Sequence, residues 1–157
     1  MHIVSGVIWA GVSLFLAFVL EPRLRALGPA VQHLVMRSIA GAVGVTFASA
    51  GTITIVSGIV LIFVLRGNGL DTLHETGWGQ AMSLGLVATV AAYVLNLITI
   101  PTNIKMRKMG KAIQGRQPTE EEMGEIQNLS SRLRISGQVT AILLLIAVGT
   151  MAVARFV

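Results

Sequence analysis

Four long stretches of this chain contain no Asp, Glu, Lys or Arg, and the charged residues gather between them. The stretches are residues 1–20, 38–65, 76–104 and 135–154, and each holds at least 20 residues. A helix rises about 1.5 Å per residue, so about 20 apolar residues cross the roughly 30 Å of hydrocarbon in a bilayer. The pattern predicts four membrane-spanning helices, at about 2–20, 40–65, 79–104 and 135–155, in a single transmembrane domain of residues 1–157.

Proline and glycine residues mark the ends of the first two helices. Glu21-Pro22 predicts the end of the first helix, because a proline ring disfavours helical geometry at the residue before it. Gly28-Pro29 predicts the start of the second helix, which then continues to Gly67 over about 37 residues. Small and hydroxylic residues are frequent along it, and in lipid they let helices approach closely. We therefore expect this second helix to sit inside the bundle.

The third and fourth helices are expected to extend beyond the membrane as a helical hairpin over about residues 105–134. The third helix passes a kink at Pro101 and ends before Gly115. Thr119 with Glu122 three residues later has the pattern of a capping box and predicts the start of the fourth helix. The predicted fold class is all-α, an integral membrane four-helix bundle with cytoplasmic helical extensions.

The distribution of positive charge predicts the orientation of the bundle. Ten of the twelve Lys and Arg residues lie in the link after the first span and in the link after the third span. Short loops rich in Lys and Arg stay in the cytoplasm, so both chain termini are expected outside it, as in a bacterial inner or plasma membrane. The net charge of +5 therefore reflects membrane topology, and no nucleic-acid partner is expected.

The composition excludes several kinds of chemistry. Only 12% of the residues are charged and 54% are apolar, which is not the composition of a soluble domain. The absence of cysteine excludes disulfides, thiol catalysis and iron–sulfur clusters. No acidic residue lies well inside a span, which argues against a proton-coupled transporter. No catalytic motif is present, so the pattern does not indicate an enzyme.

Histidine is the remaining residue type that favours a cofactor. His2, Gly6 and Trp9 fall at i, i+4 and i+7, which places an imidazole, a gap and a flat ring along one helix face. Such a face suits haem, with His2 as the axial ligand. His74 is the other histidine expected on the outer side, where it would be a second metal ligand. The alternative is that His2 is an interfacial polar residue and that Gly6 and Trp9 pack in the bundle.

Methionine offers a second type of metal ligand. Met106 and Met109 lie at i, i+3 of the third helix, and Met123 lies in the same predicted hairpin. Thioethers are soft ligands that hold copper(I). The alternative is that these methionines pack as apolar residues on an amphipathic segment.

The first helix also resembles a known family. Residues 2–11, with His2 and Trp9, followed by an apolar run to Pro22, are similar to the first helix of small membrane proteins related to the copper-resistance protein CopD and to HemJ-type protoporphyrinogen oxidases. The segment 136–152 is similar to the last helix of that group. The resemblance to this CopD-like group implies a four-helix membrane bundle in which His2 binds haem b or copper near the outer surface.

Two functions follow as hypotheses. The first is a small membrane protein that binds haem b or copper for electron transfer or metal handling. The second is a non-catalytic accessory or assembly subunit, without a cofactor, that contacts other membrane subunits or a further copy of itself. It would use the small-residue face of the second helix and the hairpin as interfaces. Both hypotheses place the chain in the lipid bilayer.

Overall fold

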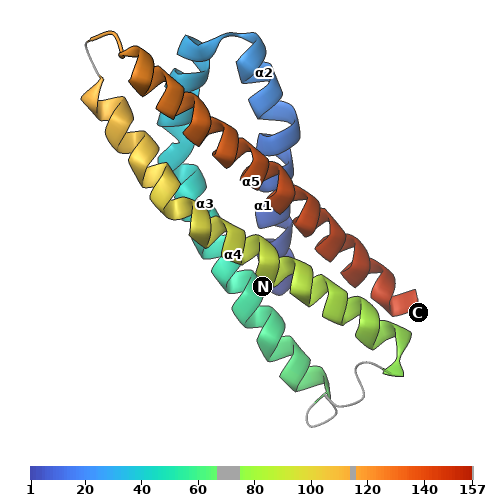
Figure 1. The fold of residues 1–157 in the computed structure, drawn as a ribbon. Helices are drawn as coiled ribbons and strands as arrows, with labels where there is room; N and C mark the ends of the chain where they lie inside the picture. Colours follow the sequence, from blue (N-terminus) through green and yellow to red (C-terminus); the bar gives the residue numbers. More distant parts are fainter. Residues whose placement is uncertain (67–74, 114–115, 157) are drawn as a thin grey trace.

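The computed structural model describes residues 1–66, 75–113 and 116–156, apart from the side chains of residues 29, 30, 33, 65, 66 and 155. The described residues form helices and no strand. α1 (His2–Leu14), the π-helical segment η1 (Phe15–Leu20) and α2 (Glu21–Ala26) make one continuous helix of 25 residues. The other long helices are α3 (Pro29–Arg66), α4 (Gly77–Ala112) and α5 (Glu120–Val153), and the short 3-10 helix η3 (Ala154–Phe156) follows α5 (Figure 1). The predicted all-α four-helix bundle is confirmed.

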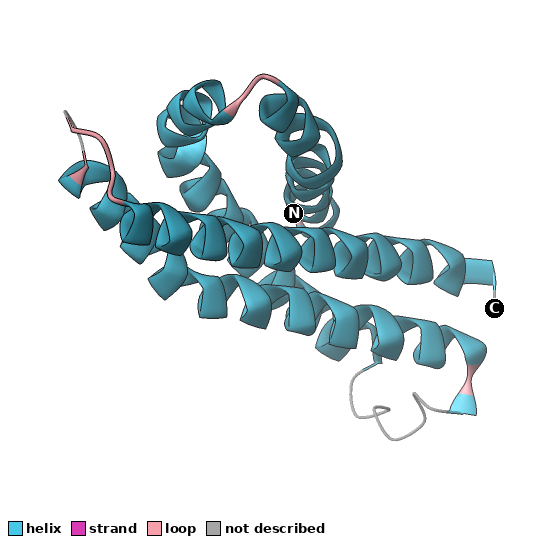
Figure 2. Cartoon of the chain, turned by 45° about the horizontal axis from the view of Figure 1, so that its top comes forward, coloured by secondary structure: helices cyan, strands magenta, loops and turns pink. Residues whose placement is uncertain are grey.

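The helices pack as two linked pairs. α4 and α5 run side by side, and α1 contacts both α3 and α5 (Figures 1 and 2). The turn between α2 and α3 lies at one end of the bundle, and the N-terminus lies toward the other. We call this second end, where α1 begins and α5 finishes, the terminal end of the bundle.

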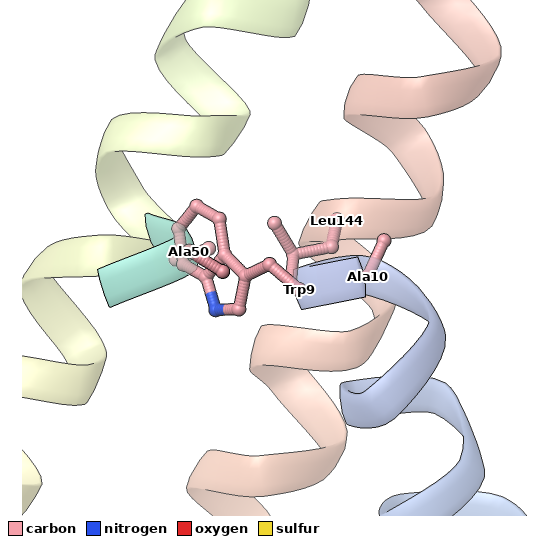
Figure 3. Packing of buried hydrophobic residues seen from close by; sticks show 5 residues of the cluster. Trp9, Ala10, Ala50 and Leu144 are labelled. Atoms are coloured by element: carbon pink, nitrogen blue, oxygen red, sulfur yellow. The ribbon is translucent and has the colours of Figure 1, made fainter. Parts of the chain in front are cut away.

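The core is built from one large side chain and several small ones. Trp9 of α1 is completely buried, and Ala10, Ala50 of α3, Ala92 of α4 and Leu144 of α5 surround it (Figure 3). Alanine lets neighbouring backbones approach closely, so a single indole ring fills the space between four helices. Trp9 therefore fixes the position of α1 relative to the other three.

The outer surface of the bundle is apolar. Large apolar residues are exposed along every helix, among them Ile3, Phe18, Val64 and Leu145. A soluble monomer rarely exposes contiguous apolar patches of this extent, whereas a lipid-facing surface requires them. The described residues contain four helices long and apolar enough to cross a membrane, as predicted for a multi-pass protein.

The predicted end of the first helix at Pro22 is wrong, because the helix passes through the proline and ends at Ala26. The backbone before Pro22 widens into a π-helical segment, in which the Glu21 N–H donates to the Leu16 carbonyl oxygen. This wider turn changes the hydrogen-bond register at the position where proline lacks an N–H and its ring would crowd a preceding carbonyl. Proline is thus accommodated near the start of α2 without a break.

The chain reverses direction at Gly28, as the sequence predicted. Gly28 has a φ of +94°, a conformation that glycine adopts without steric cost. Its N–H donates to the Arg25 carbonyl oxygen at 3.1 Å, which closes the end of α2. Pro29 is then the first residue of α3, where its missing N–H removes no helical hydrogen bond.

The expectation that the second helix sits inside the bundle is wrong for much of α3. Gly41 and Gly44 are exposed, and a Cβ added at either would meet nothing within 4 Å. Close packing is concentrated near Ala50, Gly51 and Thr54, which are buried. A long helix can present its small residues to lipid as well as to a neighbour, so their number alone did not predict which turns are covered.

The hairpin and its cap agree with the prediction. The Glu122 N–H donates to Thr119 Oγ1 at 3.3 Å, and the Thr119 N–H donates to Glu122 Oε2 at 2.9 Å, so both halves of the capping box are present. Arg116 donates to the same carboxylate, and Lys105 of α4 forms an ion pair with Glu125 of α5. The polar ends of α4 and α5 are therefore joined outside the charge-free stretches.

Candidate functional site

The His2 imidazole is hydrogen-bonded to the neighbouring helix at the terminal end of the bundle. His2 Nδ1 lies 2.8 Å from the Thr54 carbonyl oxygen and 3.3 Å from Ser57 Oγ. A carbonyl oxygen only accepts, so Nδ1 carries the hydrogen and donates it. In the neutral imidazole, Nε2 then holds the lone pair that a metal ion binds.

Gly58 provides the space for this ring. A Cβ added at Gly58 would lie 2.9 Å from His2 Cε1 and 3.3 Å from His2 Nδ1. Contacts this short force one of the groups to move, so glycine is the residue that lets the ring approach α3. The sequence placed Gly58 among the small residues of this helix but gave no signal that it faces His2.

Buried hydroxyl groups join α1 to α3 beside His2. Thr54 Oγ1 lies 3.0 Å from Ser5 Oγ and 2.7 Å from the Ala50 carbonyl oxygen. Ser5 Oγ also donates toward the carbonyl oxygens of Met1 and His2, at 3.0 and 3.1 Å. Ser5 and Thr54 are both buried, so these hydrogen bonds form away from lipid and hold the first turn of α1 in place.

A cavity of about 90 Å³ lies next to His2. All four long helices contribute to its wall, and three of the lining residues carry atoms that bind metals: His2 of α1, Met82 of α4 and Met151 of α5. The other lining residues are Thr54, Ile55, Gly58, Leu61, Ile62, Trp78, Leu86 and Thr89. None of these described lining residues is charged, so the cavity presents only neutral donors.

Met151 of α5 packs on Gly85, in the part of α4 that also carries Met82. A Cβ at Gly85 would lie 2.9 Å from Met151 Cγ and 3.0 Å from Met151 Cε, so the Met151 side chain rests on this glycine. Met82 precedes Gly85 by three residues, and residues three apart share one helix face. Neither methionine was predicted as a ligand, because each lies in a uniformly apolar span.

The helix face that was predicted to bind a planar cofactor is covered by α3. A Cβ at Gly6 would lie 3.6 Å from Thr54 Cγ2, and Trp9 is fully buried. The Trp9 ring meets Tyr93 edge to face, with centroids 6.1 Å apart, and the Tyr93 hydroxyl lies 3.0 Å from Thr52 Oγ1. His2, Gly6 and Trp9 thus share one face, as predicted, and that face packs against protein.

None of the other predicted metal ligands is among the described residues that line this cavity. His74 lies outside the described residues, as does the side chain of His33. Met106 and Met109 belong to the far half of α4, and Met123 to the start of α5. Within the described part of the chain, no group of three or more His, Cys, Asp and Glu side chains is placed to hold a metal ion.

Comparison with protein-family models, curated proteins and solved structures finds no match for this chain. Its site is described by its own geometry: an oriented imidazole, two thioethers and a small neutral cavity among four apolar helices.

Proposed function

We propose that this chain is a multi-pass membrane protein that binds a metal ion or haem iron through His2, for metal handling or electron transfer. The observation that carries the proposal is the hydrogen bond from His2 Nδ1 to the Thr54 carbonyl oxygen. Metal-binding histidines usually donate their second ring N–H to a carbonyl or carboxylate, which fixes the tautomer and orients the ring. The His2 imidazole has this arrangement.

The cavity favours an ion over haem. The cavity beside His2 has a volume of about 90 Å³. That space suits a metal ion, whereas a tetrapyrrole ring is far larger and would have to separate α1 from α3. A larger groove of about 600 Å³ also borders His2, but it is open, is lined mainly by exposed residues of α3 such as Ile53, Val56 and Val60, and has no second imidazole among its described lining residues. We therefore favour copper over haem b as the bound species.

The resemblance of the first helix to CopD-like membrane proteins supports the same proposal. The positive charge of the hairpin, of α2 and of the start of α3 adds an orientation, with both termini outside the cytoplasm. In this orientation the His2 cavity lies near the outer surface. An ion that arrives from outside would meet His2 before it reached the middle of the membrane.

The test is the metal content and absorption spectrum of the protein purified in detergent from copper- and haem-replete cells. We expect bound copper in the wild type and in His33→Ala, which changes α3 near its other end, and none in His2→Ala. A Soret band lost in His2→Ala would assign haem to the same ligand and overturn the preference for copper. Wild-type protein without metal or haem, or a bound metal unaffected by His2→Ala, would overturn the proposal.

The accessory-subunit hypothesis would then take its place. The observation that favours it is the exposed part of α3, where Gly41 and Gly44 have no neighbouring side chain. A helix of another membrane subunit can approach closely at such glycines. Colourless, metal-free protein that co-purifies with a second membrane protein would support this function.

A further inference from the structure

The described residues that line one small cavity include a histidine and two methionines from three different helices: His2, Met82 and Met151. Resting on the proposed function of His2 as a metal ligand, we propose that this cavity is a copper(I) site and that Met82 and Met151 are its sulfur ligands. The proposal identifies the ion by its charge and its ligand type, and it assigns two residues that sequence analysis did not single out.

The type of donor selects the ion. Thioether sulfur is a soft ligand that favours copper(I), whereas Mg²⁺ and Ca²⁺ take oxygen ligands and Zn²⁺ takes thiolate, imidazole and carboxylate. No carboxylate occurs among the described residues that line the cavity, and the chain has no cysteine. Among first-row metal ions, copper(I) therefore best suits one imidazole and two thioether ligands.

The cost of burying charge also favours copper(I), which is monovalent. Transfer of an ion from water into an apolar interior is costly unless opposite charge or strong ligands compensate. The described lining residues include no carboxylate to offset the charge of a bound ion, which would lie among Ile, Leu and Met side chains. The desolvation cost rises with the square of the charge, and a monovalent ion is therefore held far more easily here than a divalent one.

The packing of the donors supports a built site. Gly58 admits the imidazole, and Gly85 admits Met151 on the face of α4 that carries Met82. The two close approaches occur on different helices that border the same cavity. Gly58 thus contacts His2 and Gly85 contacts Met151. A larger residue at either position would displace the side chain that it contacts.

The experiment is a titration of the full-length protein in detergent with copper(I), under anaerobic reducing conditions, in competition with a chromophoric copper(I) chelator. We expect one copper(I) per chain. The double variant Met82→Leu with Met151→Leu keeps side-chain size nearly constant and should lower the affinity about tenfold or more. The matched control is Met106→Leu with Met109→Leu, which changes two methionines of the same helix away from the cavity and should leave the affinity unchanged.

X-ray absorption at the copper edge supplies a readout that a purely structural change would not mimic. The wild type should show sulfur and nitrogen neighbours of copper, and the double variant at positions 82 and 151 should lose the sulfur contribution. If His2→Ala removes the copper while the Met82 and Met151 variant binds it unchanged, the inference fails and the proposed function stands. If the wild type binds no copper(I), both fail. Loss of binding in the Met106 and Met109 variant alone would also overturn the inference.

Discussion

At the scale of single residues, the candidate site depends on the missing side chain of Gly58 as much as on the ligand His2. The His2 ring can donate to the Thr54 carbonyl oxygen only because residue 58 is glycine. The spacing along the first helix predicted His2 and the face that it shares with Gly6 and Trp9. It did not predict Gly58, Met82 or Met151, because the partner of an apolar helix face is set by helix packing and not by spacing along one helix.

Gly58→Ala should weaken metal binding at His2 by about tenfold or more, the usual size of an effect on an orienting group. The new methyl group meets the imidazole at 2.9 Å and displaces it from the Thr54 carbonyl oxygen. Alanine has a higher helix propensity than glycine, so α3 should stay helical. Gly44→Ala is the matched control, since nothing lies within 4 Å of its Cβ. Equal copper affinity of the two variants would show that His2 does not need this position.

Thr54→Val separates the two roles of Thr54. The variant removes the hydroxyl that meets Ser5 and Ala50 but keeps the carbonyl oxygen that accepts from His2. Hydrogen bonds between membrane helices contribute roughly 0.6 kcal/mol on average, so the free energy of unfolding should fall by less than about 1 kcal/mol. Denaturation in mixed detergent measures this change, and the chelator competition should show unchanged metal affinity. A large loss of affinity would mean that the hydroxyl itself orients the site.

At the scale of helices, the glycine, proline and capping residues at helix ends predicted the structure better than the apolar residues within the helices. Gly28-Pro29 and Thr119 with Glu122 predicted the starts of α3 and α5. The helix end predicted at Pro22 was wrong, because a π-helical segment lets α1 continue into α2. The covered turns of α3 could not be predicted, since small residues occur along both its packed and its exposed turns. The helices were thus predictable individually, while their packing was not.

Thr119→Ala should loosen the first turn of α5. The variant removes the oxygen that accepts from the Glu122 N–H, and the loss of such a cap costs about 1 kcal/mol. Amide hydrogen exchange should therefore become about fivefold faster in residues 120–126, while residues 140–150 of the same helix provide the internal reference. Unchanged exchange in the first turn would show that the capping box does not stabilise it.

At the scale of the whole molecule, the four helices and their exposed apolar surface define a membrane protein, and the loop charges predict its orientation. A reporter fused after Val157 should be active in the periplasm or outside the cell, and one inserted near the start of α5 should be active in the cytoplasm. The ten basic residues of α2, the start of α3 and the hairpin are the physical reason. A C-terminal reporter in the cytoplasm would contradict this topology and would move the His2 cavity to the inner side.

The central claim is that His2 binds a metal through Nε2 while Nδ1 stays on the Thr54 carbonyl oxygen. Nitrogen NMR of the protein labelled with ¹⁵N-histidine tests it most directly. His2→Ala identifies the His2 signals among the three histidines. We expect the Nδ1–H tautomer in the metal-free protein, and a large shift of Nε2 with Nδ1–H retained after one equivalent of copper(I). His2 nitrogen signals that do not change on addition of copper(I), or a shift of Nδ1 in place of Nε2, would contradict the account.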